Sequence, residues 1–257
     1  MMDDMNADLW DRYMESSFSE VNILTEEQYE KGGVQFGHLY EGYLPRDKGS
    51  CILDLGAGAG HFLYFLKQKG YDNFLGIDIS EQQVKYCREK ISDRVMKADA
   101  TEFLRDKCGE YDLITAHDML EHVPKEKVIP LVQLIYSSLK KDGIFILRVP
   151  NMSNPFSLDS RYGDFTHEVG YTGKSLKQIL SLTGFNEIEI LYKNKVPPKT
   201  LRNRVRRVMV NAFQGVIRFF YYIQDFSVPK CLDKNIVVAA RKSSKGNAAR
   251  SQSGGCC

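Results

Sequence analysis

The sequence predicts an α/β fold in which helices cover both faces of a mostly parallel sheet. Short apolar runs at 51–55, 73–78 and 111–116 alternate with helical patterns, an order typical of strand–helix–strand units. The first run ends in a glycine-rich turn over 56–60, and the second ends at Asp78. Glycine lets the backbone turn sharply and approach a ligand closely. A carboxylate at the end of the next strand can accept hydrogen bonds from a ribose diol, so the pair indicates a nucleoside-binding site.

The composition is that of an ordinary globular chain. Its 257 residues suffice for one sizeable core, and the net charge of +2 provides no overall field that attracts nucleic acid. The acidic start lacks the basic and apolar stretches of a signal peptide, and no apolar run of ~18 residues is present. The cysteines at 51, 87, 108 and 231 lack metal-ligand spacing. We therefore expect a cytoplasmic protein with reduced thiols and no nucleic-acid partner.

The elements follow in a regular order after an N-terminal segment. Residues 1–44 are predicted to form a polar helical cap that Gly32 and Gly33 interrupt, and 45–241 are predicted to form one domain. The helix after Asp78 starts with Ser-Glu-Gln-Gln, a sequence of capping-box form. The other expected elements are helices at about 59–69, 81–90, 125–139 and 173–183, a brief helix after Asp99, and strands at 94–98, 143–149, 185–192 and 235–241.

Three segments depart from this alternation. Residues 151–172 form a long irregular loop, and loops of this length inside a compact domain are usually functional. Residues 193–230 are an insertion ahead of the last strand. The tail at 242–257 is small and polar, so we expect it to be disordered. Its Cys256-Cys257 end resembles that of prenylated Rab-type GTPases, but nothing else in the chain does, and incidental cysteines are the expectation.

The turn and the acid before it identify a family resemblance. Asp54-Leu-Gly-Ala-Gly-Ala-Gly resembles motif I of the class I S-adenosylmethionine-dependent methyltransferases, with a methyltransferase domain of type 11 or 23. A dinucleotide fingerprint would need glycine where His61 stands. The acid suits a ligand with a cationic amino acid tail, whereas it would repel a pyrophosphate.

The resemblance implies a Rossmann-like, seven-stranded, mostly parallel sheet. The last strand would insert antiparallel beside the fifth, with an N-terminal helical segment in front of the domain. The family usually joins its last two strands by a short hairpin. Here a helical insertion of about 40 residues separates them.

The resemblance also implies S-adenosyl-L-methionine as the cofactor and a set of contacts to it. The glycines would wrap the methionine portion, Asp54 would bind its ammonium group, and Asp78 would hold the ribose hydroxyls. A helix-capping role is the alternative for Asp78. An acid after the third strand would bind the adenine amino group, and the carbonyl that ends the fourth strand would meet the methionine amino group. The expected cofactor-binding residues are Asp54, Gly56, Gly58, Gly60, Asp78, Ile79, Asp99, Ala100 and His117.

Methyl transfer to oxygen releases a proton and calls for a general base. His122 follows the fourth strand in a Leu-Glu-His sequence that resembles methyltransferases of the ubiquinone-biosynthesis type, and His167 lies in the long loop. Either histidine is a candidate base; a purely structural role is the alternative for each. Asp118 and Asp164 are candidates to assist a histidine or bind acceptor hydroxyls, and Arg161 and Tyr162 to contact an acceptor phosphate or sugar. No spacing such as H-x-x-x-H supports a metal, so none is expected.

The loop over 161–167 indicates an acceptor class. With the Gly-Tyr-Thr sequence after it, this loop resembles bacterial methyltransferases of surface-glycan and O-antigen gene clusters. That resemblance implies a sugar hydroxyl or a glycan-linked group as acceptor, in surface polysaccharide biosynthesis. An O-methyltransferase of a quinone or another lipid-like molecule is the second hypothesis. A methyltransferase-like binding module without turnover is the third.

The insertion contains a basic amphipathic helix at 199–226. Its apolar residues recur at steps of three or four, namely Leu201, Val205, Val208, Ala212, Val216, Phe219 and Ile223. Four arginines cluster in its first half. This pattern fits a peripheral contact with the inner face of a membrane, which would bring the enzyme to a lipid-linked glycan. Packing on its own domain or in a homodimer is the alternative.

Overall fold

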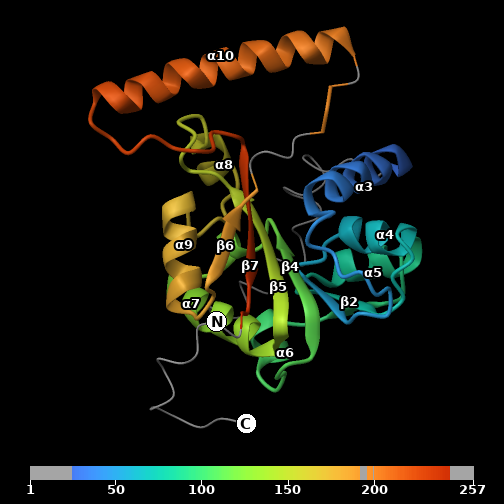
Figure 1. Cartoon of the computed structure of the whole chain (residues 1–257). Coiled ribbons are helices and arrows are strands. Elements are labelled where there is room, and N and C mark those ends of the chain that lie inside the picture. The colour runs from blue at the N-terminus through green and yellow to red at the C-terminus, as the bar shows by residue number, and fades with distance from the viewer. Residues whose placement is uncertain (1–24, 192–195, 199, 244–257) are drawn as a thin grey trace.

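The computed structural model describes residues 25–191, 196–198 and 200–243 (Figure 1). The first part of the expected cap and nearly all of the tail lie outside these residues. Within the described residues, seven strands form one sheet in the order β3-β2-β1-β4-β5-β7-β6. Strand β7 runs antiparallel to both of its neighbours, whereas the other pairings are parallel. The predicted fold class is confirmed.

The bounds of the elements agree closely with the sequence analysis. The strands are β1 (Ile52–Leu55), β2 (Phe74–Asp78), β3 (Val95–Lys97), β4 (Tyr111–His117), β5 (Leu139–Pro150), β6 (Glu187–Ile190) and β7 (Asn235–Arg241). The helices are α3 (Glu26–Tyr40), α4 (His61–Gln68), α5 (Glu81–Lys90), α6 (Ala100–Leu104), α7 (Lys125–Ser138), α8 (Leu158–Tyr162), α9 (Gly173–Leu182), α10 (Leu201–Ile223) and the short 3-10 helix η2 (Leu120–His122).

Three expectations were wrong in detail. Strand β5 begins at Leu139, earlier than expected, because this residue still pairs with Tyr111 across an irregularity in the register. The loop expected to be irregular contains α8. Helix α3 continues through Gly32 and Gly33, because Tyr29, Phe36 and Tyr40 of the same helix are buried. Their packing outweighs the roughly 0.5–1 kcal/mol that each helical glycine costs.

The core lies on both faces of the sheet. Successive residues of a strand point to opposite faces, so Leu53 and Ile52 belong to different apolar clusters. One cluster packs the sheet against α7 and α9, and the other packs it against α3 and α4 (Figure 1). The sheet thereby holds the carboxyl ends of β1, β2 and β4 in fixed positions relative to one another.

Candidate active site

The turn between β1 and α4 requires glycine for two separate reasons. Gly56, Gly58 and Gly60 have φ angles of 66°, 54° and 85°, a region that side chains with a Cβ rarely adopt. A Cβ at Gly56 would lie 2.8 Å from the Met119 side chain, and one at Gly60 would lie 2.4 Å from the Cys87 sulfur. Packing thus leaves no room for a side chain at Gly56 or Gly60.

Asp78 ties the end of β2 to this turn. Its Oδ2 accepts a hydrogen bond from the Gly58 backbone N–H at 2.8 Å, and its Oδ1 accepts one from the Ser80 N–H at 2.9 Å. Burial raises the pKa of the carboxyl to about 6, despite these two hydrogen bonds. Asp78 does not cap α5, because the N-cap of this helix is Ser80, whose side chain accepts from the Gln83 N–H. Each carboxylate oxygen has two acceptor sites, so Asp78 can also accept from a ribose diol.

Asp54 lies at the centre of a buried polar chain. Its Oδ1 accepts a hydrogen bond from the Thr115 hydroxyl at 2.6 Å and lies 3.5 Å from Nδ1 of His117. The other ring nitrogen, Nε2, is 2.9 Å from the Tyr40 hydroxyl. The His117 side chain is thus held between β1 and α3, while its backbone carbonyl remains the predicted cofactor contact.

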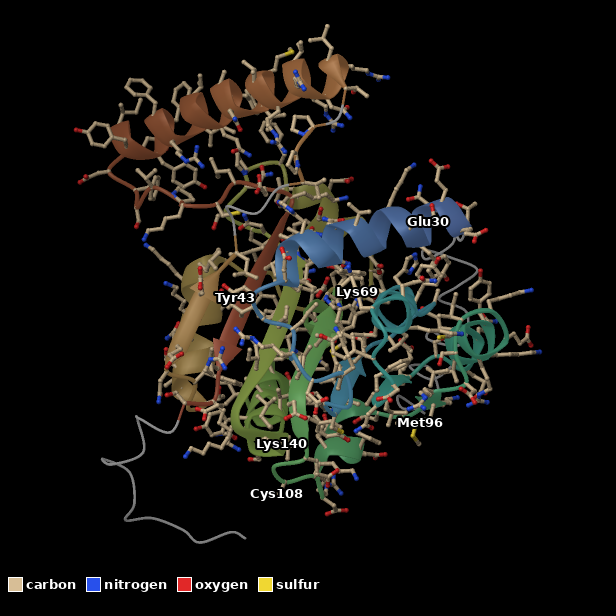
Figure 2. The ribbon with its side chains drawn as sticks, turned by 45° about the vertical axis from the view of Figure 1, so that its right-hand side comes forward. Glu30, Tyr43, Lys69, Met96, Cys108 and Lys140 are labelled. Carbon is tan, nitrogen blue, oxygen red and sulfur yellow. The ribbon has the colours of Figure 1, made fainter. Side chains whose placement is uncertain are left out.

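Helix α3 covers the glycine turn. The Tyr29 hydroxyl donates a hydrogen bond to the Ala59 carbonyl at 2.8 Å, and its ring stacks on His61 with centroids 4.3 Å apart. Figure 2 shows α3 crossing the domain on this side, with Lys69 below it. Helix α3 therefore closes the turn from outside and limits access of water to it.

The adenine end of the predicted site is the least enclosed part. Asp99 Oδ1 accepts hydrogen bonds from the backbone N–H groups of Thr101 and Glu102, at 2.8 and 3.0 Å, so it caps α6. Ala100 is the first residue of α6. Ile79 is 41% exposed. The adenine contact of Asp99 stays a prediction.

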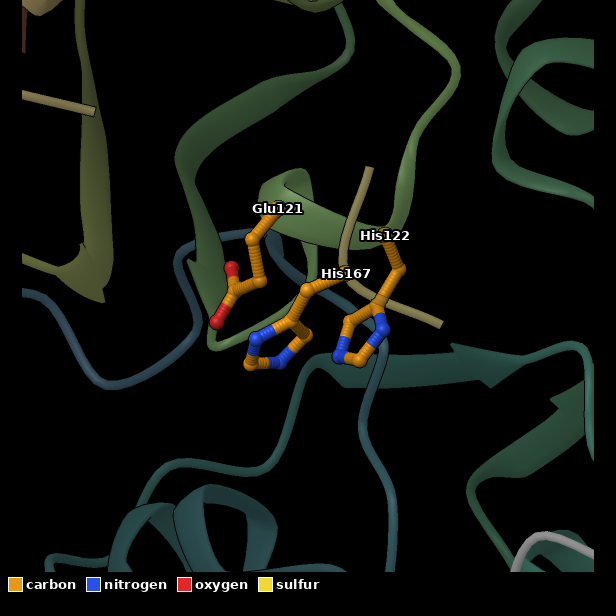
Figure 3. A group of neighbouring side chains, drawn as sticks. All are labelled: Glu121, His122 and His167. Carbon is orange, nitrogen blue, oxygen red and sulfur yellow. The ribbon is translucent and has the colours of Figure 1, made fainter. Parts of the chain in front are cut away.

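The structure brings the two candidate bases together (Figure 3). The ring centroids of His122 and His167 are 4.6 Å apart in a T-shaped arrangement. The first histidine comes from η2, and the second follows α8 in the long loop. Their proximity depends on the loop folding back onto η2, where the backbone N–H of Glu168 donates to the Glu121 carbonyl at 2.7 Å.

Hydrogen bonds determine the tautomer of His122. The Thr166 hydroxyl donates to Asp164 Oδ1 at 2.6 Å. A hydroxyl carries one hydrogen, so Thr166 must accept the bond that joins it to His122 Nδ1 at 2.8 Å. Nδ1 therefore carries the proton, and Nε2 is the basic nitrogen. Burial and the adjacent His167 lower the pKa of His122 to about 4, which keeps the imidazole neutral at pH 7.

His167 is oriented in the same way. Its Nδ1 bonds to the Ser160 carbonyl, and a carbonyl can only accept, so this nitrogen also carries the hydrogen. The guanidinium of Arg161 donates to the carbonyls of His167 and Glu168. Nε2 is thus the basic nitrogen of the second histidine as well, on a loop that Arg161 holds closed.

Glu121 completes the cluster. The residue is 2% exposed, and its Oε2 has no hydrogen-bond partner among the described residues. Burial, with Asp118 nearby, raises the pKa of this carboxyl. One ligand atom each from Glu121, His122 and His167 lie within 4.8 Å of one another (Figure 3). Two imidazole nitrogens and a carboxylate can hold a divalent cation, although the absence of a metal stays the prediction from sequence.

All four predicted acceptor-binding residues have contacts within the protein. Asp118 pairs with the partly buried guanidinium of Arg148, Asp164 binds Thr166, and Arg161 donates to carbonyls of its own loop. Tyr162 is 73% exposed on α8, and the Arg161 guanidinium lies 5.1 Å from the centroid of its ring. Acceptor contacts by these four residues stay predictions.

Sequence reasoning missed Thr166, Glu121 and Arg148. Thr166 stands two residues after Asp164, a spacing that allows a side-chain turn. Glu121 is adjacent to a candidate base, and Arg148 is the one charged residue in the apolar run 144–149. These signals are weak, because each residue acquires its role only through a partner distant in sequence.

Comparison with known proteins places this geometry in a family. Residues 31–190 match the family described as a methyltransferase domain, and the match covers more than half of the chain. The chain belongs to this family. It is an S-adenosylmethionine-dependent methyltransferase. The predicted family, enzyme class and cofactor are confirmed, whereas the resemblance to glycan-cluster enzymes is not tested.

Individual relatives support the same assignment. The methyltransferase is 29% identical over 172 residues to a carboxy-S-adenosyl-L-methionine synthase of Nautilia profundicola, covering 55% of this chain and 72% of that protein. It is 23% identical over 160 residues to a ubiquinone biosynthesis O-methyltransferase of Acinetobacter baylyi, covering 52% and 67%. A crystal structure of an S-adenosylmethionine-dependent methyltransferase from Archaeoglobus fulgidus superposes with a TM-score of 0.63 at 26% identity, covering 83% and 94%.

The residues of the turn fit the cofactor of this family. The methyltransferase has a tight turn with three glycines at positive φ and a buried carboxylate bonded to the N–H of one of them. It also has a buried Asp54, whose charge suits an ammonium group. Together, these residues would hold the methionine and ribose portions.

Proposed function

We propose that the methyltransferase transfers the methyl group of its cofactor to an oxygen atom of the acceptor. His122 accepts the proton of the acceptor hydroxyl. The observation that carries this proposal is the chain Asp164–Thr166–His122, which fixes the base in the required tautomer. The bound cofactor supplies an activated methyl group. The protein then has to align the acceptor and take up its proton.

His167 is the second proton-accepting group. Its ring contacts that of His122, and its Nε2 is also the basic nitrogen. Burial of His122 disfavours the imidazolium, so a proton that arrives there is readily passed on. His167 lies in the loop after α8 and takes that proton on from His122.

The proposed acceptor is a sugar hydroxyl or a glycan-linked group in surface polysaccharide biosynthesis. The 161–167 loop supports it, since the loop that carries the resemblance also contributes His167 and the exposed aromatic ring of Tyr162. An exposed tyrosine offers an apolar face with a polar tip, which suits a sugar ring.

A quinone or another lipid-like molecule is the second candidate. An apolar hollow of about 480 Å³ lies between α10 and the loop, lined by Pro155, Ile217, Phe220, Tyr221, Gln224 and Phe226. The similarity to an O-methyltransferase of ubiquinone biosynthesis also favours this class.

An acceptor panel with labelled cofactor tests the proposal. Sugar and glycan intermediates are compared with quinols, and both methyl incorporation and S-adenosylhomocysteine are measured. His122→Ala should lower kcat by roughly 10²- to 10⁴-fold, the usual contribution of a general base. Cofactor affinity should stay normal.

Three results would contradict the proposal. Cofactor binding without turnover on any acceptor would indicate a binding module. Turnover on nitrogen or carbon acceptors alone would exclude oxygen. Loss of activity in a chelator, restored by a divalent cation, would assign Glu121, His122 and His167 to a metal instead of to proton transfer.

A further inference from the structure

Helix α10 contacts its own domain through polar side chains. Gln214 donates to the Leu232 carbonyl at 3.2 Å, Arg218 to the Pro229 carbonyl at 3.4 Å, and the Tyr221 hydroxyl to the Ser153 carbonyl at 3.2 Å. Steps of four and three place these residues on one face of the helix. None of the residues of α10 is buried. The polar face of this helix therefore points inward.

The apolar face points outward. At about 100° per residue, the apolar positions lie opposite the three contact residues. Side chains project from α10 on the side turned away from the domain (Figure 2). The outward apolar residues, all between 52% and 76% exposed, are Leu201, Val205, Val208, Met209, Val216, Phe219 and Ile223. The alternative in which this face packs on its own domain is therefore wrong for the described residues. An exposed apolar patch of this extent marks an interaction site.

The charge of α10 indicates what binds to its outward face. Residues 201–224 contain five arginines and no acidic residue. Arg202 and Arg206 lie along one side of the apolar face, and Arg204 lies along the other. Two copies of this helix face to face would bring like charges together. An anionic surface instead matches both the charge and the apolar face.

We propose that α10 lies in the interface of an anionic lipid bilayer, with its apolar face among the acyl chains and Arg202, Arg204 and Arg206 at the phosphates. None of the described helices is long and apolar enough to cross a membrane, so the contact is parallel to the surface. The loop around α8 adds to the same surface. Phe156 is 62% exposed, and its ring lies 5.5 Å from that of Phe213 on α10.

Vesicle sedimentation of the full chain tests this proposal without any acceptor. Vesicles of phosphatidylcholine alone are compared with vesicles that contain one quarter phosphatidylglycerol, at low and high salt. The wild type should sediment with the anionic vesicles and be released by salt. Val205→Gln with Phe219→Gln should lower the partition coefficient at least tenfold without changing charge. The control, Asn203→Gln with Asn211→Gln, also lies on α10 and should bind like the wild type.

Each other outcome overturns the proposal. Wild type that never sediments, or that binds neutral and anionic vesicles equally, excludes an anionic bilayer. A solution dimer that the apolar double variant dissociates, without vesicle binding, assigns the face to a second copy. Cofactor affinity of the variant shows that the domain remains folded. Because turnover is not measured, failure here leaves the proposed O-methyl transfer unaffected.

Discussion

Replacing Thr166 by valine would test whether the Asp164–Thr166–His122 chain positions the base. The substitution keeps the shape of the side chain but removes the hydroxyl that accepts from His122 Nδ1 at 2.8 Å and donates to Asp164 at 2.6 Å. Leaving such a group without its partner costs about 1–3 kcal/mol. In the state in which His122 carries the proton of the acceptor, this cost raises the activation free energy. We then expect kcat to drop by roughly 5- to 150-fold, since 1.36 kcal/mol corresponds to a tenfold change in rate.

The assay is the initial rate of S-adenosylhomocysteine formation at saturating cofactor. Cofactor affinity should be unchanged, because the glycine turn and Asp78 do not contact Thr166. Thr166→Ser is the matched control, since it keeps the hydroxyl and should retain most of the rate. If the Thr166→Val variant has the wild-type rate while the His122→Ala variant is inactive, the tautomer argument is refuted. His122 would then act without the Asp164–Thr166 hydrogen bonds.

Three further predictions concern the cofactor side. Asp78→Ala should weaken cofactor binding roughly 10- to 100-fold, because hydrogen bonds to a charged group contribute about 1.5–3 kcal/mol; unchanged affinity in calorimetry would disprove the ribose contact. Since burial raises the pKa of Asp78 to about 6, cofactor affinity should fall as pH drops through 6, whereas kcat at saturation should persist until His122 becomes protonated near pH 4. Gly60→Ala should lower the free energy of unfolding more than Gly70→Ala. Both glycines have positive φ, but only a Cβ at Gly60 would lie 2.4 Å from the Cys87 sulfur. Equal shifts in melting temperature would contradict the steric argument.

The prediction of the cofactor half of the site rests on features that are local in sequence. The turn over 56–60 and Asp78 belong to one strand–helix–strand unit, and the glycines mark backbone conformations that few other residues adopt. The glycine-rich motif and its family resemblance therefore sufficed to predict where these residues lie. The same local reasoning failed at Gly32 and Gly33, where burial of aromatic side chains in α3 overrides a weak helix propensity.

The catalytic half could be predicted only as a set of candidates. His122 and His167 were both identified, but the hydroxyl that orients one of them was not. Asp118 was expected near the acceptor, yet it pairs with Arg148 from the adjacent strand β5. These partners meet only after the sheet has formed, and no spacing along the chain encodes them.

The insertion shows a different limit of sequence analysis. Periodicity predicts an amphipathic helix, but it does not say which face meets the domain. Asn151, which directly follows β5, holds the end of the insertion, because its side chain donates to the carbonyls of Cys231 and Asp233, just before β7 begins. The start of the loop that carries His167 and the end of the insertion are thus joined at the sheet edge where β5 ends. The face of α10 that meets the domain is set by Gln214, Arg218 and Tyr221, whose side chains donate to carbonyls distant in sequence. Periodicity along the chain does not encode these partners.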